Sequence, residues 1–390
     1  MFFIRLQAMA VRDIVFSDMK LRNTIWCALG LATLTAGTLA AQVPPGIEGK
    51  LKEIGPIVDP PCTAKLYRPL MPANDVNSSA SPLYPGITIA RDVSFGPNPK
   101  DVVDIFSADK GAASRPVLMY IPGGAGNKIE QQDREANAFY DNIMRWATKN
   151  GMVGVNMQRH PGASWDDGGR DVSRMIQWVQ ANIAKYKGNP DRMFIWAQSA
   201  GNGPLGVYIG RPELWGPKGV GVKGAIFMSG QFNILPVQPA APGGGRGGLD
   251  ILAGAGKTCG LPAGAAFSDA GAIAGPSRAD PPPAGGRGGP GFGRGPQVDA
   301  ATQLARSSLP ALKTTTVKIM LATAEFDPGV NGTHSAFNQA LHDELCKAGS
   351  DHCPTMLFEK GESHMSEVFS IDTADKTVSG PILKWIKSIK

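Results

Sequence analysis

The sequence predicts an α/β fold with a mostly parallel central sheet and helices on both faces. Short apolar segments alternate with amphipathic segments over residues 87–390, as strands and covering helices do in such folds. The chain has 390 residues, of which 42% are hydrophobic and 18% charged, so it can bury one large core with added segments. We therefore expect one decorated domain over residues 87–390.

The elements of this domain are expected in a regular order. Residues 87–95 and 101–107 have strand-like composition, and Gly96-Pro97-Asn98-Pro99 supplies the turn between them. Buried strands are expected from apolar runs at 116–121, 151–157, 191–196, 222–229, 316–323 and 355–358. Helices are expected from the spacing of residues at 131–149, 171–186, 200–209, 335–347 and 381–389.

Residues 1–41 have the features of an export signal. Residues 19–22 (Met-Lys-Leu-Arg) form a basic start, and Met19 is a candidate native initiator. An apolar stretch at 24–39 leads to Ala40-Ala41, where we expect cleavage. This predicts a periplasmic or secreted protein without stable membrane insertion. An uncleaved membrane anchor is the alternative, although the apolar run is short for a membrane span.

Two further segments lie outside the regular pattern. Residues 42–86 are proline-rich and weakly patterned, and we expect an N-terminal arm there. Residues 238–297 are rich in Gly, Pro and Arg, and this composition buries too little apolar surface to offset its ordering entropy. We expect a mostly disordered insertion. Its Arg-Gly repeats are the only clustered basic residues of a chain with net charge +6, and we expect no nucleic-acid partner.

The cysteines permit two disulfides in an oxidising compartment. Five are present, and four remain once Cys27 is removed with the signal. Cys346 and Cys353 close a short loop between a helix and a strand and are the favoured pair, whereas Cys62 and Cys259 pair only by elimination. The sequence shows no Cys and His spacing typical of a metal site, and we expect neither a metal nor an organic cofactor.

Ser199 is the candidate nucleophile. Residues 191–201 run from a buried strand through Gln-Ser-Ala-Gly into a helix of small residues, which is the context of a nucleophile elbow. A serine on this strained turn needs small neighbours two positions away, and Ala197 and Gly201 meet that need. Alanine in place of the usual first glycine weakens the motif, and an ordinary helix-capping serine is the alternative.

A glycine-rich loop, Pro122-Gly-Gly-Ala-Gly126, follows the expected strand at 116–121. Acyl transfer develops negative charge on a carbonyl oxygen, and preorganised backbone N–H groups can hold that charge. Glycines let the main chain approach the substrate without a Cβ in the way. A phosphate-binding loop would need a Gly-Lys-Ser/Thr that does not follow. We therefore interpret the segment as an oxyanion loop.

The candidate acid and base follow later strands. Asp327 comes after the strand at 316–323 and before a Pro-Gly turn, where its carboxylate can orient an imidazole. Glu325 is the alternative acid, and a turn-forming aspartate is the structural alternative. Of five histidines, only His364 follows the last strand, although a lone loop histidine is usually a surface residue. The order Ser199, Asp327, His364 is that of the α/β-hydrolases.

On these motifs the sequence resembles the esterase and lipase branch of the α/β-hydrolases, the carboxylesterases and hormone-sensitive-lipase-like enzymes with a His-Gly-Gly-Gly loop. The resemblance covers about residues 87–235 and 300–390. It rests on the block from Asp171 to Gly201, on Thr323-Ala-Glu-Phe-Asp-Pro328 and on Ser363-His-Met-Ser366.

The resemblance implies that the amides of Gly123, Gly124 and Ala200 form the oxyanion hole. Two residues depart from the family pattern: Pro122 stands where the family has histidine, and Ala197 where it has glycine. The missing histidine normally steadies the loop, and the proline is a candidate for stiffening it in another way.

The function expected from these features is hydrolysis of small carboxylic esters through an acyl-enzyme. A peptidase or amidase on the same fold, and a hydrolase-like binding protein without catalysis, are the alternatives. The short arm leaves no room for a gating domain, and no triad member is missing. Residues 127–133 and 160–169 and the segment after Ser229 are expected to line the pocket, with Trp165 and Phe232 as candidate lining residues.

Overall fold

The structure is a computed structural model, and it describes residues 42–71, 84–124, 127–128, 139–160, 165–230, 255–260, 309–330 and 333–390. The chain divides into two units, Met1–Gln42 and Val43–Lys390, and the regular elements belong to the second. The expected signal at 1–41 and most of the expected insertion at 238–297 lie outside the described residues. Within those residues, no helix combines the length and the hydropathy that crossing a membrane requires.

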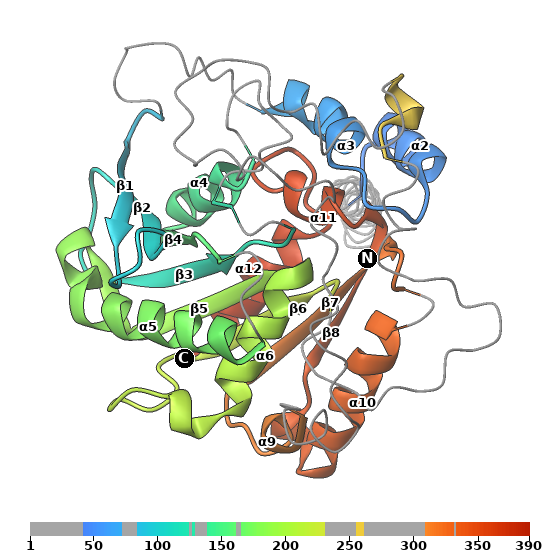
Figure 1. Ribbon diagram of the computed structural model, residues 1–390. Coiled ribbons are helices and arrows are strands. Elements are labelled where there is room, and N and C mark those ends of the chain that lie inside the picture. Colours follow the sequence, from blue (N-terminus) through green and yellow to red (C-terminus); the bar gives the residue numbers. More distant parts are fainter. Residues whose placement is uncertain are drawn as a thin grey trace, which may run out of the picture. The chain divides into compact units, whose positions relative to one another are not determined.

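An eight-stranded sheet in the order β1-β2-β4-β3-β5-β6-β7-β8 forms the centre of the second unit (Figure 1). The first three strands in this order pair antiparallel, and β4, β3, β5, β6, β7 and β8 pair parallel. The strands are β1 (Ile87–Ser94), β2 (Val102–Ala108), β3 (Arg115–Ile121), β4 (Val153–Met157), β5 (Gly188–Gln198), β6 (Gly224–Met228), β7 (Lys318–Phe326) and β8 (Thr355–Ser363). The predicted fold class, with its mostly parallel sheet, is confirmed.

Helices cover both faces of the sheet because alternate strand residues point to opposite sides. In β5, Phe194 and Trp196 join one apolar cluster, and Ile195 joins the other. The first cluster includes residues of α2 (Pro45–Ile54), α3 (Pro60–Tyr67), α4 (Asp141–Lys149), α11 (Ser366–Phe369) and α12 (Ser379–Ser388). The second includes residues of α5 (Trp165–Asn182), α6 (Asn202–Gly210), α9 (Leu309–Leu312) and α10 (Thr333–Lys347).

The expected N-terminal arm contains two helices, α2 and α3. Pro45 and Pro60 each begin a helix, where the missing N–H is not needed and the fixed φ favours the first turn. The Asp59 carboxylate accepts a hydrogen bond from the amide of Cys62 and so caps α3. Cys62 is joined to Cys259 and Cys346 to Cys353, the two pairs that the sequence predicted.

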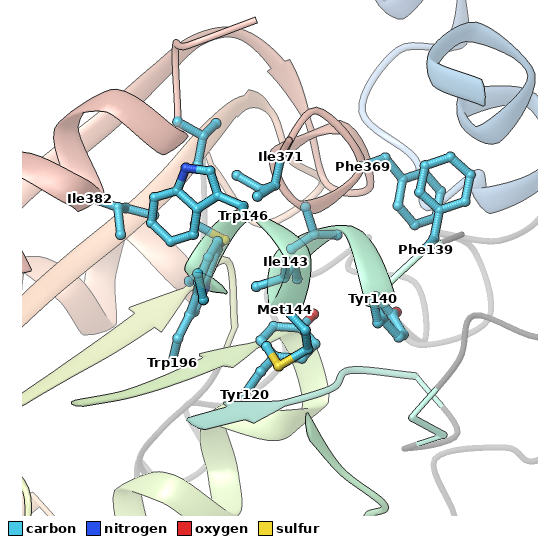
Figure 2. Close-up of a cluster of buried hydrophobic side chains, with 14 of the residues drawn as sticks. Tyr120, Phe139, Tyr140, Ile143, Met144, Trp146, Trp196, Phe369, Ile371 and Ile382 are labelled. Atoms are coloured by element: carbon cyan, nitrogen blue, oxygen red, sulfur yellow. Dashed lines mark hydrogen bonds between the residues drawn. The ribbon is translucent and has the colours of Figure 1, made fainter. Parts of the chain in front are cut away.

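Figure 2 shows the apolar cluster between α4 and the sheet. Tyr120 of β3 and Trp196 of β5 meet edge to face, with ring centroids 5.7 Å apart. Trp146 of α4 makes a similar edge contact with Trp196 at 6.5 Å. Phe139, just before α4, stacks on Phe369 of α11 at 4.0 Å. These contacts join the centre of the sheet to the segment that carries His364.

Replacement of Ile143 by alanine tests this packing. Ile143 of α4 is fully buried in the cluster, so Ile143→Ala is expected to lower the free energy of unfolding by about 2–5 kcal/mol. The control Met356→Ala changes a side chain that is 45% exposed and is expected to cost no more than about 0.5 kcal/mol. Urea denaturation with the disulfides intact measures both. Equal midpoints for the two variants would contradict the role given to Ile143.

Candidate active site

Ser199 lies on the turn that joins β5 to α6. It begins the short 3-10 segment Ser199–Gly201, directly after the last residue of the strand. Its φ of 52° is in the left-handed region, which residues with a Cβ rarely adopt. Such a conformation persists only where the surroundings impose it, and it is the backbone of a nucleophile elbow.

Three glycines surround this turn at distances that exclude a larger residue. A Cβ at Gly123 would lie 2.7 Å from the Cβ of Ser199, and one at Gly230 would lie 2.3 Å from the carbonyl oxygen of Ser199. A Cβ at Gly201 would lie 2.5 Å from the carbonyl oxygen of Ile121. The glycine-rich loop after β3 and the turn after β5 are therefore packed backbone against backbone. This contact places the expected oxyanion loop beside Ser199.

Arg159 binds the backbone carbonyls of the glycine-rich loop. Its Nε donates to the carbonyl oxygen of Pro122 at 3.1 Å, and one terminal nitrogen donates to the carbonyl oxygens of Gly123, at 3.4 Å, and of Gly124. Burial lowers the pKa of the guanidinium to about 10, so it remains charged at neutral pH. Arg159 was not among the site residues predicted from the sequence. Its position two residues after the end of the buried strand β4 was the available signal.

Asp327 and His364 are in contact at the ends of β7 and β8. His364 Nδ1 and Asp327 Oδ2 are 2.5 Å apart, and both side chains are buried. The other oxygen of Asp327 accepts a hydrogen bond from the amide of Gly329 at 2.6 Å. With Nδ1 occupied by a carboxylate, Nε2 is left as the nitrogen that can accept a proton.

Glu325, the alternative acid, has a different partner. Its Oε2 accepts a hydrogen bond from the amide of Gly361 at 2.7 Å, which fixes the carboxylate to β8. Of the two carboxylates that close β7, the structure therefore places Asp327 against the histidine. The remaining expected site residue, Ala200, follows Ser199 in the same 3-10 turn.

Gln198 links the turn to the histidine. Its side-chain amide donates to the carbonyl oxygen of His364 at 3.0 Å and to Glu367 Oε1 at 2.9 Å. Glu367 also accepts from the hydroxyl of Ser229 at 2.6 Å. The residue before Ser199 thereby fixes the main chain of His364, and the end of β5 is linked to the segment that follows β8.

Three buried glutamates lie beneath this site. Burial, and then the charge of Glu367, raises the pKa of Glu359 well above its ordinary range. Burial, and then the charge of Asp327, raises the pKa of Glu367. Glu367 accepts two hydrogen bonds from neutral donors, and these bonds favour its ionised form. We therefore place the proton of the pair on Glu359. The proton on Glu359 thus limits the pair to one negative charge beside Asp327.

Glu362 has its own partners. Burial, and then the charge of Asp375, raises the pKa of Glu362 well above its ordinary value of 4.5. Its Oε2 accepts hydrogen bonds from the hydroxyls of Ser366 and Tyr67, the latter at 3.3 Å. A protonated Glu362 therefore ties α3 to the segment that follows β8.

The raised pKa of Glu362 makes stability depend on pH. The native state holds a proton on Glu362 that the unfolded chain loses above about pH 4.5. The contribution of this proton to the free energy of unfolding is therefore complete below that pH and is lost as the pH rises through the native pKa. Glu362→Gln keeps a neutral side chain and is expected to lose less stability than wild type between about pH 4.5 and about pH 8. Thermal unfolding across this range measures the difference. The exposed Glu53→Gln is the control, and a wild-type slope in Glu362→Gln would show that Glu362 is ionised in the folded protein.

Several expected pocket residues lie outside the described part of the chain. They include Phe232, the side chain of Trp165, residues 129–133 and residues 161–164. The described residues of the site are those that carry its acid, base and loop chemistry.

The segment that contains Ser199 is similar to known esterases. Residues 103–210 match the family model BD-FAE. A stretch of 115 residues is 33% identical to Esterase LipQ of Mycobacterium tuberculosis and covers 28% of this chain and 26% of that protein. A stretch of 89 residues is 37% identical to the probable carboxylic ester hydrolase LipM of the same organism and covers 22% and 19%. The chain thus spans about a quarter or less of the length of these relatives.

A solved structure extends the similarity to the whole fold. A bacterial heroin esterase matches with a TM-score of 0.52 at 16% identity, over 90% of this chain and 98% of that one. At this identity the likeness concerns the fold. The chain therefore has the α/β-hydrolase fold, its residues 103–210 match the BD-FAE model, and stretches of it are similar to proteins named as esterases.

Proposed function

We propose that the protein is a serine hydrolase that cleaves carboxylic esters of small molecules. The observation that carries the proposal is the buried contact of His364 with Asp327 at the same sheet edge as the strained turn of Ser199. The named activities of LipQ and LipM support an ester as the substrate class. A peptidase on the same fold and a binding protein without catalysis remain the alternatives that the experiment below separates.

The proposed reaction follows from the positions of these three side chains. His364 Nε2 accepts the proton of Ser199 Oγ as that oxygen attacks the ester carbonyl. Asp327 holds Nδ1–H and stabilises the imidazolium that forms. The imidazolium then protonates the leaving alcohol, and the acyl group stays on Ser199. Water, activated by His364 in the same way, releases the acid.

The negative charge of the tetrahedral intermediate needs donors that are fixed before the reaction begins. We assign this role to the amides of Gly123, Gly124 and Ala200. The contact of Gly123 with Ser199 and the bonds of Arg159 to the loop carbonyls support the assignment. Arg159 is a positioning residue in this scheme, because it acts through the loop.

Export is part of the same proposal. The basic and apolar N-terminal segment and the two disulfides support a protein that works in the periplasm or outside the cell. An ester substrate in that compartment would be a small molecule met outside the cytoplasm.

Ser199→Ala tests the proposal. The variant is expected to lose labelling by a fluorophosphonate probe and to lose about four orders of magnitude or more in the turnover of p-nitrophenyl acetate and butyrate. Ser388→Ala, at the end of α12, is the control and should label as wild type does. Equal labelling of wild type and Ser199→Ala overturns the assignment. Turnover of aminoacyl nitroanilides without ester turnover would favour the peptidase.

Arg159→Met tests the loop support. Removal of the bonds to three carbonyls is expected to lower kcat by at most about 100- to 1,000-fold, the scale for a lost oxyanion donor, and to change KM much less. Arg159→Lys should recover part of the loss, because it restores a cation but not the planar fork. The control is Arg170→Met, an exposed residue of α5. Unchanged kcat in a folded Arg159→Met would remove Arg159 from the mechanism.

A further inference from the structure

A second group of ionisable side chains consists of Asp101, His160 and Asp171, and His160 directly follows Arg159 in the sequence. Asp101 immediately precedes β2, His160 follows Arg159 after β4, and Asp171 is on α5. In the described ranges, these three offer one ligand atom each, all within 4.8 Å of one another. The proposed ester hydrolysis uses none of them.

The contacts within this group are close but are not hydrogen bonds of good geometry. His160 Nε2 is 3.2 Å from Asp101 Oδ1, and His160 Nδ1 is 3.0 Å from Asp171 Oδ2. Asp101 is fully buried and Asp171 nearly so, while the His160 side chain is 17% exposed. Yet Asp101 Oδ1, His160 Nε2 and Asp171 Oδ2 are buried atoms without a hydrogen-bond partner. Converging buried polar atoms left in this state indicate a missing cation.

The charges around the group lead to the same conclusion. Arg174 of α5 contacts the outer oxygen of Asp171 and lies 3.6 Å from Asp101 Oδ1. The other oxygen of Asp101 accepts a hydrogen bond from the amide of Asn98 at 3.1 Å. One guanidinium and one imidazole thus face two buried carboxylates. Two carboxylates in a buried position favour an added cation, and a divalent ion bound to the unprotonated ring would supply that charge.

We propose that Asp101, His160 and Asp171 bind a divalent transition-metal ion, with Zn²⁺ as the best fit. An imidazole nitrogen and carboxylate oxygens are zinc ligand types, and a water molecule would complete four-coordination from the exposed side of His160. Imidazole disfavours Ca²⁺ and Mg²⁺, which prefer oxygen ligands. Bonds of about 2 Å place tetrahedral ligand atoms roughly 3.4 Å apart, and these ligand atoms lie within 4.8 Å of one another, so the widest pair would close by about 1.4 Å or less.

The ion would act on the active site through position. It joins the start of β2, the end of β4 and α5, and so fixes the main chain at His160 beside Arg159. Arg159 in turn holds the carbonyls of Pro122, Gly123 and Gly124. The site is therefore structural, and its loss is expected to lower thermal stability and only secondarily to slow ester turnover.

Zinc binding is measured on the full mature chain, untagged, with disulfides intact and metals first removed by EDTA. Equilibrium dialysis against ZnCl₂ with metal analysis is expected to give one equivalent for wild type and a higher Tm with zinc. His160→Gln and Asp171→Asn should each lose that equivalent and the shift in Tm. His352→Gln, an exposed histidine, and His364→Gln, in the catalytic dyad, should keep both.

The outcomes separate the possibilities. Absence of a zinc equivalent in wild type, or its retention in a folded His160→Gln, overturns the proposal. Loss of the equivalent in His364→Gln places the zinc at the catalytic histidine and also overturns it. Uptake of Ca²⁺ in preference to Zn²⁺ contradicts the transition-metal assignment. A protonated His160 that bridges the two carboxylates predicts no zinc uptake at all. Failure of ester turnover in every sample leaves the metal analysis unchanged, so this test is independent of the proposed function.

Discussion

The parallel pairing of β3 with β5 is the constraint on which the rest of the site depends. It sets Ile121 opposite Ala197. The glycine-rich loop follows Ile121 and the turn of Ser199 follows Ala197, so these two segments lie in direct contact. The contact is so close that Gly123 and Gly201 have no room for a Cβ. Because β7 and β8 end at the same edge, Asp327 and His364 arrive there without a long loop. The sheet therefore positions Asp327, His364, Ser199 and the glycine-rich loop at one edge.

Burial of the charged forms of Glu359, Glu362 and Glu367 costs free energy, and their hydrogen bonds and protons reduce that cost. Glu367 accepts from Gln198 and Ser229, so its hydrogen bonds fix the turn and the neighbouring strand end. A proton on Glu359 spares the fold an additional buried negative charge near Asp327, and a proton on Glu362 does the same beside Asp375. The Glu359 and Glu367 pair then carries at most one negative charge beside Asp327.

The sequence was sufficient for the fold class and for the order of the expected site, because both depend on local patterns. Buried strands are continuous apolar runs, and Ser199, Asp327 and His364 each follow one. Helices α2 and α3 were not predicted because residues 42–86 are proline-rich and weakly patterned, whereas a proline at the first helical position favours a helix. The roles of Arg159 and Glu367, and the cluster at His160, depend on contacts between distant segments, which no spacing in the chain reveals.

Pro122 stands where the resembled family has a histidine that steadies the loop, and Arg159 binds the loop carbonyls here. A planar guanidinium carries several donors in a fixed fork, and here it binds three consecutive carbonyls of the loop. An imidazole has an ordinary pKa near neutral pH, so its charge would change there. Arg159, with its pKa lowered only to about 10, stays charged at neutral pH. The loop carbonyls are therefore held by a cation whose charge does not change near neutral pH.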